Sequence, residues 1–244
     1  MTAFLADVRG TIWQPDAKHG PLPRVLLSMT LVTGLVDAFS YLLLGHVFVA
    51  NMTGNVVLLG FALVGAPGFS IAASLTALVS FMAGALGGGW IATRYAAHRG
   101  RLHSSAGALQ AVFLAVGVIL AGLSGSPVTA GYRYPLIVVL AVAMGLQNAA
   151  ARKLAVPDLT TTVLTLTITG IAADSKLAGG PGSKAGRRLV AVATMLAGAV
   201  IGAALVLHAP IFYPLAAAFV VIVLGAATTS VLGRPDPAWV RSSP

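Results

Sequence analysis

Long apolar runs with almost no charge limit this chain to one class of fold. Charged residues make up 9% of its 244 residues, whereas a soluble domain carries about 25%. Runs of about 20 apolar residues are long enough to cross a bilayer as helices. The net charge of +9 would suggest nucleic-acid binding in a soluble protein, but here the basic residues lie between apolar runs, where they set membrane orientation. We therefore expect a polytopic membrane protein in contact with the lipid bilayer and with no nucleic-acid partner.

Eight apolar segments follow one another along the chain. Because lipid offers backbone groups no partner, each should form a helix. The second differs from the others in a polar cluster near its start, and the sixth in being short and rich in Thr. Residues 1–23 hold no apolar stretch long enough for a signal peptide, so we expect solvated tails at residues 1–23 and 233–244. The segments cover Val25–Gly45, Val47–Gly65, Ser70–Arg94, Ala106–Gly122, Tyr134–Ala151, Leu159–Ala173, Leu189–Leu207 and Phe212–Leu232.

The placement of Lys and Arg tests whether the second and sixth segments cross the membrane. If all eight segments cross, ten basic residues lie on the cytoplasmic side and five outside. If those two segments enter and leave on the same side, the numbers become fourteen and one, the exception being Arg133. Because basic residues concentrate on the cytoplasmic side, this count favours six crossing helices, two re-entrant segments and cytoplasmic termini. Eight crossing helices remain the alternative.

Three motifs of the first half recur in the same order in the second half. Each match alone would be weak in a chain rich in Ala, Gly and Leu, but together they indicate an internal duplication. We place the first repeat at residues 24–125 and the second at residues 134–232. The matches pair residues 34–38 with 145–149, residues 51–56 with 158–163, and residues 82–88 with 196–202.

Each repeat then contains three crossing helices, an odd number, so the second repeat must be inverted relative to the first. Inverted repeats with interrupted helices at matching positions are typical of secondary transporters. The expected fold is an all-α polytopic membrane protein of two inverted repeats, each with three transmembrane helices and one re-entrant or broken helix. GxxxG pairs at matching positions should let helices pack closely and make a homodimer reasonable: Gly84 with Gly88, and Gly198 with Gly202.

Two stretches of the first repeat resemble the signature of the YoaK family. They are residues 32–41 (VTGLVDAFSY) and residues 47–55 (VFVANMTGN), with Gly45 between them. The resemblance is close from Val32 to Leu63 and looser, but consistent in length, over the rest of the chain. It implies a helical protein of the bacterial inner membrane. The family's domain is one of unknown function, so the resemblance supplies neither a substrate nor a mechanism.

Asp37 is the acidic residue that lies well inside an apolar segment. A charged Asp at the centre of a membrane helix costs about 2.5–3.5 kcal/mol, so it normally faces a polar cavity or a partner. A carboxyl group in that position suits a proton-coupling or cation-binding site. The alternative is a hydrogen bond to a neighbouring helix that serves packing only.

Other polar side chains gather at the start of the second and sixth segments and on the fifth. Their amide, hydroxyl and carboxyl groups could contact a solute at a helix break. The alternatives are helix capping for the first two groups and interhelical hydrogen bonds for the third. The candidate residues are Asn51, Thr53 and Asn55 in the first group, Asp158, Thr160 and Thr162 in the second, and Gln147 and Asn148 in the third.

Missing residues and motifs narrow the chemistry further. The chain has no Cys and shows no HExxH, P-loop or GxSxG motif. We expect no enzyme activity, no cofactor and no metal site. The function we predict is secondary transport of a small polar solute or ion across the inner membrane, with proton coupling through Asp37. A passive channel of the same architecture and a non-transporting scaffold or accessory subunit are the alternatives.

Overall fold

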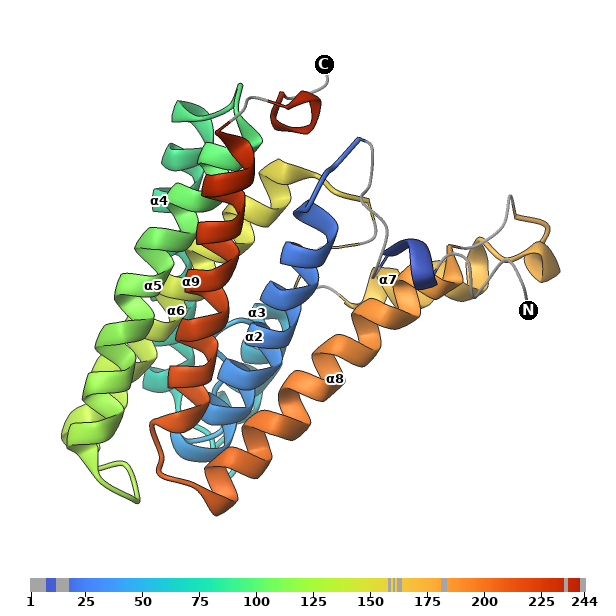
Figure 1. The fold of residues 1–244 in the computed structure, drawn as a ribbon. Coiled ribbons are helices and arrows are strands. Elements are labelled where there is room, and N and C mark those ends of the chain that lie inside the picture. The colour runs from blue at the N-terminus through green and yellow to red at the C-terminus, as the bar shows by residue number, and fades with distance from the viewer. Residues whose placement is uncertain are drawn as a thin grey trace.

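The computed structural model describes residues 8–11, 18–157, 159, 161, 164–180, 184–234 and 237–241, and within them the chain is built from helices (Figure 1). Six of the described helices are long and apolar enough to cross a membrane. Two further helices are shorter, residues 8–11 form a helical turn, and two 3₁₀ turns complete the described elements. The long helices are α2 (Leu22–Leu43), α4 (Ile71–Arg94), α5 (Arg99–Ser124), α6 (Ala130–Leu154), α8 (Ala185–His208) and α9 (Tyr213–Gly233); the short ones are α3 (Met52–Leu63) and α7 (Leu164–Ala173), and the turns are η1 (Lys176–Ala178) and η2 (Ala238–Val240).

The prediction of eight apolar segments, six of them long enough to cross a membrane, is confirmed among the described residues, where the second and sixth form the two short helices. Most helix starts differ by three to seven residues from those expected, and α3 begins at Met52 rather than Val47. Helix α5 begins at Arg99 rather than Ala106, because the His98 ring accepts a hydrogen bond from the Arg101 N–H and caps an extra polar stretch. Helix α7 begins at Leu164 rather than Leu159, and the positive φ of 58° at Thr161 interrupts the helical path before it.

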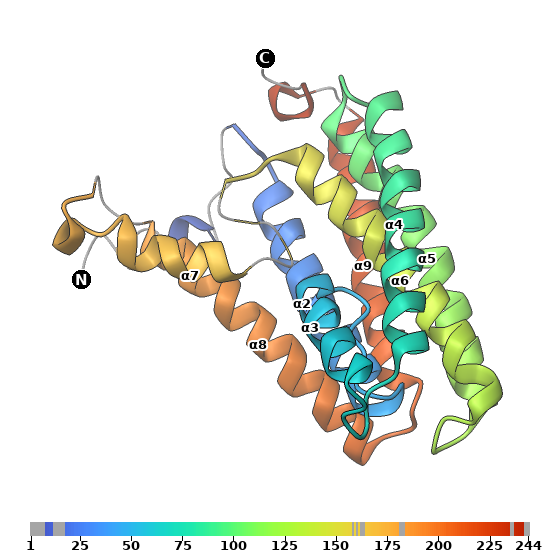
Figure 2. The ribbon, with the colours of Figure 1, turned by 180° about the vertical axis from the view of Figure 1, so that it is seen from behind.

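Helices α2 and α6 form the centre of the bundle and run in opposite directions (Figures 1 and 2). Helix α2 packs against α8 and α9, while α6 packs against α4 and α5, and α5 packs against α9. The fully buried core side chains come largely from these two central helices, including Leu26, Phe39, Leu140 and Met144. Outward-facing positions of α4, α5, α8 and α9 carry exposed Leu, Val and Ile side chains, as expected of surfaces that meet lipid.

Glycines let the central helices touch their partners at backbone distance. A β-carbon on Gly34 of α2 would lie 2.6 Å from the Ala199 nitrogen of α8, and one on Gly145 of α6 would lie 2.7 Å from the Ala85 nitrogen of α4. The partner helices carry glycines of their own at these contacts, because a β-carbon on Gly198 or Gly84 would meet the carbonyl oxygen of Leu31 or Val142. The GxxxG pairs thus serve close helix packing, as predicted.

Helix α3 lies beside α4, and the connections before and after it are held together. The His46 ring nitrogen lies 3.0 Å from the Gly68 carbonyl oxygen, which joins the α2–α3 and α3–α4 connections. Helix α2 ends and α4 begins at the same end of the bundle (Figure 2). The segment that contains α3 therefore leaves this end and comes back to it.

In the described parts of the terminal segments, Arg9, Lys18 and Arg241 are exposed, whereas Thr11, His19, Trp239 and Val240 are buried, so these tails are solvated only in part. The Trp239 ring of η2 packs over Gly20 and Gly100 and is 8% exposed. The buried Arg99 guanidinium donates to the Leu154 carbonyl oxygen at 2.6 Å and lies 3.0 Å from the His19 ring. Trp239 and His19 are buried because they find partners at the start of α5, in Gly100 and Arg99.

Substituting the packing glycines should separate the helix pairs. We expect Gly34→Ala and Gly145→Ala each to destabilise the protein by about 1–3 kcal/mol, because the added methyl group overlaps backbone atoms of the partner helix. Gly122→Ala is the matched control, since no atom lies within 4 Å of that position, and it should be neutral or stabilising by up to about 1 kcal/mol. Thermal unfolding of the purified protein in detergent measures the difference, and equal midpoints for all three variants would contradict this packing.

Candidate functional site

The buried carboxylate of Asp37 holds the connection between α2 and α3. Its Oδ1 accepts hydrogen bonds from the backbone N–H groups of Val49 and Ala50, at 3.1 and 2.9 Å. These groups precede the first turn of α3 and have no helical partner of their own. Within a membrane such N–H groups cost free energy unless the protein satisfies them. Asp37 therefore has a structural role in this state, in which it fixes the connection that precedes α3 to α2.

Asn55 also bonds to this connection, and we call its hydrogen bonds together with those of Asp37 the clasp. Its side-chain amide donates to the Phe48 carbonyl oxygen at 2.6 Å, and its side-chain oxygen accepts from the Phe48 N–H at 2.9 Å. Asn51 caps α3, with its side-chain oxygen accepting from the Gly54 N–H at 3.2 Å. Asn55 is fully buried, whereas Thr53 of the same group is exposed. The structure thus brings Asp37, Asn51 and Asn55 together and leaves Thr53 on the outer side of α3.

A buried amide network connects the two central helices. The Gln147 amide of α6 donates to the Thr33 hydroxyl at 2.9 Å and to the Met29 carbonyl oxygen at 3.2 Å, both on α2. Its oxygen accepts from the Gln110 amide of α5 at 2.8 Å. Among the residues that the structure describes, no group donates to the buried Gln110 Oε1. Gln147 thus joins three helices at the bundle centre.

The candidate residues predicted from the sequence did not include Gln110 or His103. Gln110 is the one polar side chain in the predicted segment Ala106–Gly122, and this position alone could have identified it as a candidate. His103 is buried near one end of α5, where its ring contacts the Thr229 hydroxyl at 2.9 Å and the Met29 sulfur at 3.3 Å. Its position in an extended α5 was not evident, because the segment was expected to begin after it.

Asn148 lies apart from both of these groups. Its side-chain amide donates to the Met144 carbonyl oxygen at 2.9 Å within α6. It lines a groove of about 780 Å³ between α4 and α6, which also contains Thr93, Arg152 and Lys153. Gln147 and Asn148 are neighbours in sequence but face different surroundings, one the bundle centre and the other this groove.

The second-half group is described only in part. Asp158, Thr160 and Thr162 lie outside the described residues. Thr161, between two of them, is buried, and its hydroxyl has no hydrogen-bond partner within the described part of the chain. The equivalence of this group with Asn51–Asn55 stays a prediction.

Comparison with known proteins gives a family and a relative. The family described as "Protein of unknown function (DUF1275)" matches residues 25–228. The chain is 39% identical over 158 residues to "UPF0700 transmembrane protein YoaK" of Bacillus subtilis (strain 168), and this match covers 62% of the chain and 66% of the relative, just under two thirds of its length. No solved structure matches.

Removing the Asp37 carboxylate should loosen the connection to α3. We expect Asp37→Ala to lower the free energy of unfolding by about 2–4 kcal/mol, because it leaves two buried N–H groups without an acceptor. Asp37→Asn keeps one acceptor oxygen and should lose less. Thr53→Ala, at an exposed position of α3, is the control and should change little. Unfolding in detergent gives the energies, and hydrogen exchange at Val49 and Ala50 should accelerate in Asp37→Ala; unchanged exchange there would disprove the clasp.

Proposed function

Because the chain belongs to the DUF1275 family, whose function is unknown, we propose from its own residues that it is a secondary transporter of a small polar solute or ion. The observation that carries this proposal is the matched packing of the two halves. Residues paired by the sequence repeat make the same contacts in opposite halves of the bundle. Such internal symmetry is typical of transporters that alternate access between the two sides of the membrane.

The glycine contacts support two inverted repeats. Gly34 and Gly145 are equivalent in the repeat, and so are their partners Ala199 and Ala85. Gly202 meets the Ala38 β-carbon as Gly88 meets that of the equivalent Ala149. The opposite directions of α2 and α6, the first helices of the two repeats, support the inversion (Figure 1). On this proposal α3 and α7 are the re-entrant elements, and the return of the α3 segment to its starting end supports this for α3.

The residues that form the clasp on α3 are replaced in the second repeat, and we assign this asymmetry a role in transport. Asn148 stands where the first repeat has Asp37, and Pro157 stands where it has Ala50. Proline has no N–H to donate, and the Asn148 amide donates to Met144 within its own helix. On this proposal the two ends of the pathway would open by different steps.

Asp37 is the coupling group in this mechanism. Protonation would remove the charge that holds the N–H groups of Val49 and Ala50 and so change the relative stability of the inward- and outward-open states. On this proposal the solute contacts the polar side chains that the sequence places near the two helix breaks and on α6. These are Asn51, Thr53, Asn55, Gln147, Asn148, Asp158, Thr160 and Thr162.

A scaffold without transport is the second candidate, and one observation favours it. The polar side chains at the centre are largely bonded to the protein itself: Asp37 and Asn55 to the α2–α3 connection, and Gln147 to α2 and α5. A passive channel of the same architecture is a variant of the transport proposal. On this proposal the chain has no enzyme activity. The proposal includes a homodimer, because the glycine faces of the helices allow one.

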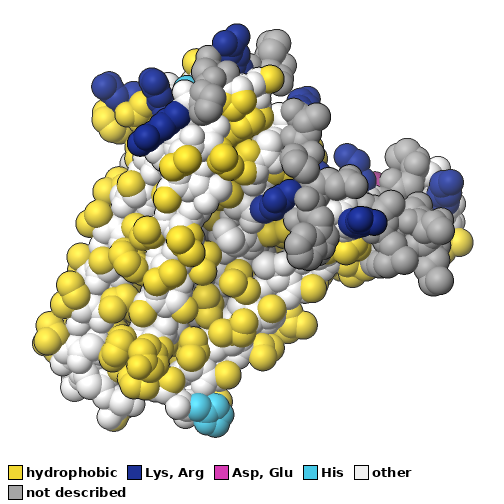
Figure 3. All heavy atoms as spheres, in the orientation of Figure 1, with side chains coloured by type: hydrophobic (Ala, Val, Ile, Leu, Met, Phe, Trp, Pro, Cys, Tyr) yellow, Lys and Arg dark blue, Asp and Glu magenta, His cyan; other side chains and the backbone are white. Residues whose placement is uncertain are grey.

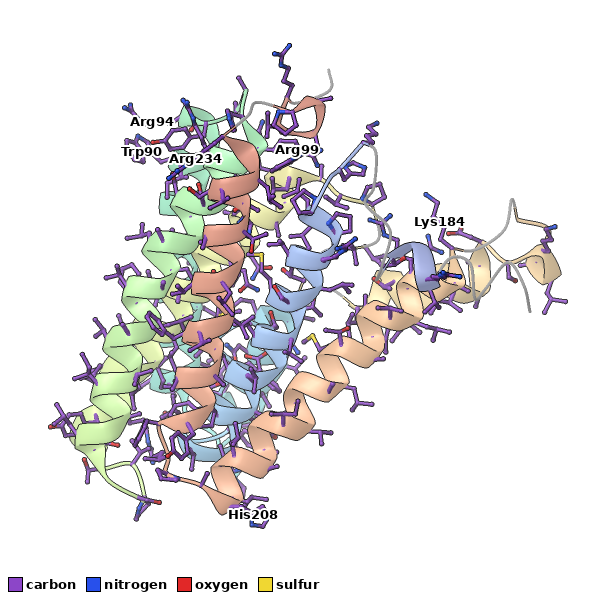
Figure 4. All side chains as sticks on the ribbon, in the orientation of Figure 1. Trp90, Arg94, Arg99, Lys184, His208 and Arg234 are labelled. Carbon is purple, nitrogen blue, oxygen red and sulfur yellow. The ribbon has the colours of Figure 1, made fainter. Side chains whose placement is uncertain are left out.

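Charge distribution supports the proposed orientation in the inner membrane. Lys and Arg side chains gather at the end of the bundle where α2 begins and α9 ends, and also around Lys184 at the start of α8. His208 lies at the opposite end (Figures 3 and 4). Arg133 is at that opposite end too, next to Gly45. The basic end is then cytoplasmic, and so are both termini.

Single cysteines in this cysteine-free chain test the orientation. We expect Arg234→Cys in intact cells to resist a membrane-impermeant maleimide, because the position lies at the basic, cytoplasmic end. His208→Cys, exposed at the other end, should react from outside. The same reagent on permeabilised cells is the control for reactivity. Labelling of Arg234→Cys from outside would show that the protein has the opposite orientation.

Transport is tested in proteoliposomes. Purified protein is reconstituted and challenged with a panel of monovalent ions and small polar metabolites across a pH gradient, with currents recorded on a supported membrane. We expect at least one compound to give a saturable, pH-gradient-dependent current that Asp37→Asn abolishes. Asp174→Asn, the same change at a half-exposed side chain away from the α2–α3 connection, is the control and should keep the current; Asp174 pairs with Arg188 at 2.7 Å near the start of α8.

The alternatives give different results in the same assay. A current that rises linearly with gradient and does not saturate would indicate a channel. Absence of any current from protein whose Asp37→Asn variant unfolds earlier than wild type would support the scaffold and count against transport.

A further inference from the structure

The groove between α4 and α6 has an apolar wall and a basic end. Phe81, Ala85, Gly89 and Thr93 line it along one side of α4, at intervals of four residues. This stripe is about 18 Å long at the helical rise of 1.5 Å per residue. On α6 the lining continues to Arg152 and Lys153, which lie in the last turn and are exposed. The groove thus changes from apolar to cationic along its length.

Trp90 and Arg94 mark where this change meets the membrane surface. Trp90 is 66% exposed, and the Arg94 guanidinium lies 6.0 Å from the centre of its ring. Tryptophan concentrates at the level of lipid headgroups. Both residues lie at the basic end of the bundle (Figure 4). Phe81, more than two turns earlier on α4, is then at the depth of acyl chains, and Arg152 is at the depth of phosphates.

We propose that this groove binds an anionic phospholipid. The phosphate would lie between Arg152 and Lys153, since basic pockets between membrane helices on the cytoplasmic side attract anionic headgroups. The acyl chain would follow the stripe from Thr93 to Phe81. Asn148 lines the middle of the groove, at the level where a glycerol ester needs polar contacts. The volume of about 780 Å³ is in the range of ligand pockets and holds the headgroup with part of a chain.

An amphiphile fits the groove better than a soluble solute or free phosphate. Most of the lining is apolar, and a small hydrophilic solute would leave Phe81 and Ala85 without a partner. A free phosphate would use only the basic end. This inference does not depend on transport, because a scaffold would present the same groove.

Lipid binding to the whole purified chain tests the proposal. Protein in neutral detergent is titrated with phosphatidylglycerol, with phosphatidylcholine of the same acyl chains, and with inorganic phosphate; thermal unfolding and native mass spectrometry report binding. We expect phosphatidylglycerol alone to raise the unfolding midpoint and to be retained as a bound lipid. Arg152→Gln with Lys153→Gln should weaken this binding tenfold or more, because neither side chain then carries the charge that attracts the phosphate. The matched control, Lys176→Gln with Lys184→Gln, removes the same charge from exposed positions that do not line the groove and should bind as wild type.

A second pair of variants fills the groove without removing charge. No atom lies within 4 Å of a β-carbon at Gly89 or at Gly122, and both positions are exposed on long helices. Gly89→Phe should abolish phosphatidylglycerol binding, whereas Gly122→Phe, outside the groove, should not. The proposal is overturned if phosphatidylcholine binds equally, if inorganic phosphate gives the same stabilisation, if both charge variants lose binding alike, or if Gly89→Phe binds as wild type. Should the charge variant fail to fold, the comparison of the two phenylalanine variants decides.

Discussion

Every interruption of a helix inside a bilayer leaves backbone groups that the protein itself must satisfy, and the architecture around α3 follows from this constraint. Asp37 supplies the acceptor for two such groups and Asn55 supplies both a donor and an acceptor for Phe48. Without these side chains, backbone groups of Phe48, Val49 and Ala50 would lack hydrogen-bond partners. The carboxylate thus accepts the hydrogen bonds that water would accept outside the membrane. Any transport cycle that moves α3 must replace those hydrogen bonds during the movement.

Close glycine packing and buried polar groups stabilise the bundle in different ways. Gly34 and Gly145 bring the central helices to backbone distance from their partners, where lipid cannot compete and dispersion contacts are dense. The Gln147 amide then joins α6 to α2 across the bundle centre. The glycine contacts thus act through close backbone packing, whereas the amide network joins the helices through directional hydrogen bonds.

Much of the fold could be predicted from sequence because its signals are local. Apolar length indicated the helices, and the polar residues of the second and sixth segments identified the two short ones. The candidate site was harder, since its contacts depend on how a connection folds back. Nothing in the sequence says that Asp37 meets residues twelve and thirteen positions later, or that Trp239 packs over Gly20. Gln110 could have been found, because an amide inside an otherwise apolar helix needs a partner.

The pairing of α2 with α8 sets the order in which this protein can be assembled. Helix α2 begins at Leu22, while its partner α8 begins at Ala185. At ribosomal rates of 5–20 residues per second, the partner follows about 8–30 s later. During that interval the glycine face of α2 lies open to lipid or to other nascent helices, while the clasp on α3 can already form from residues close in sequence.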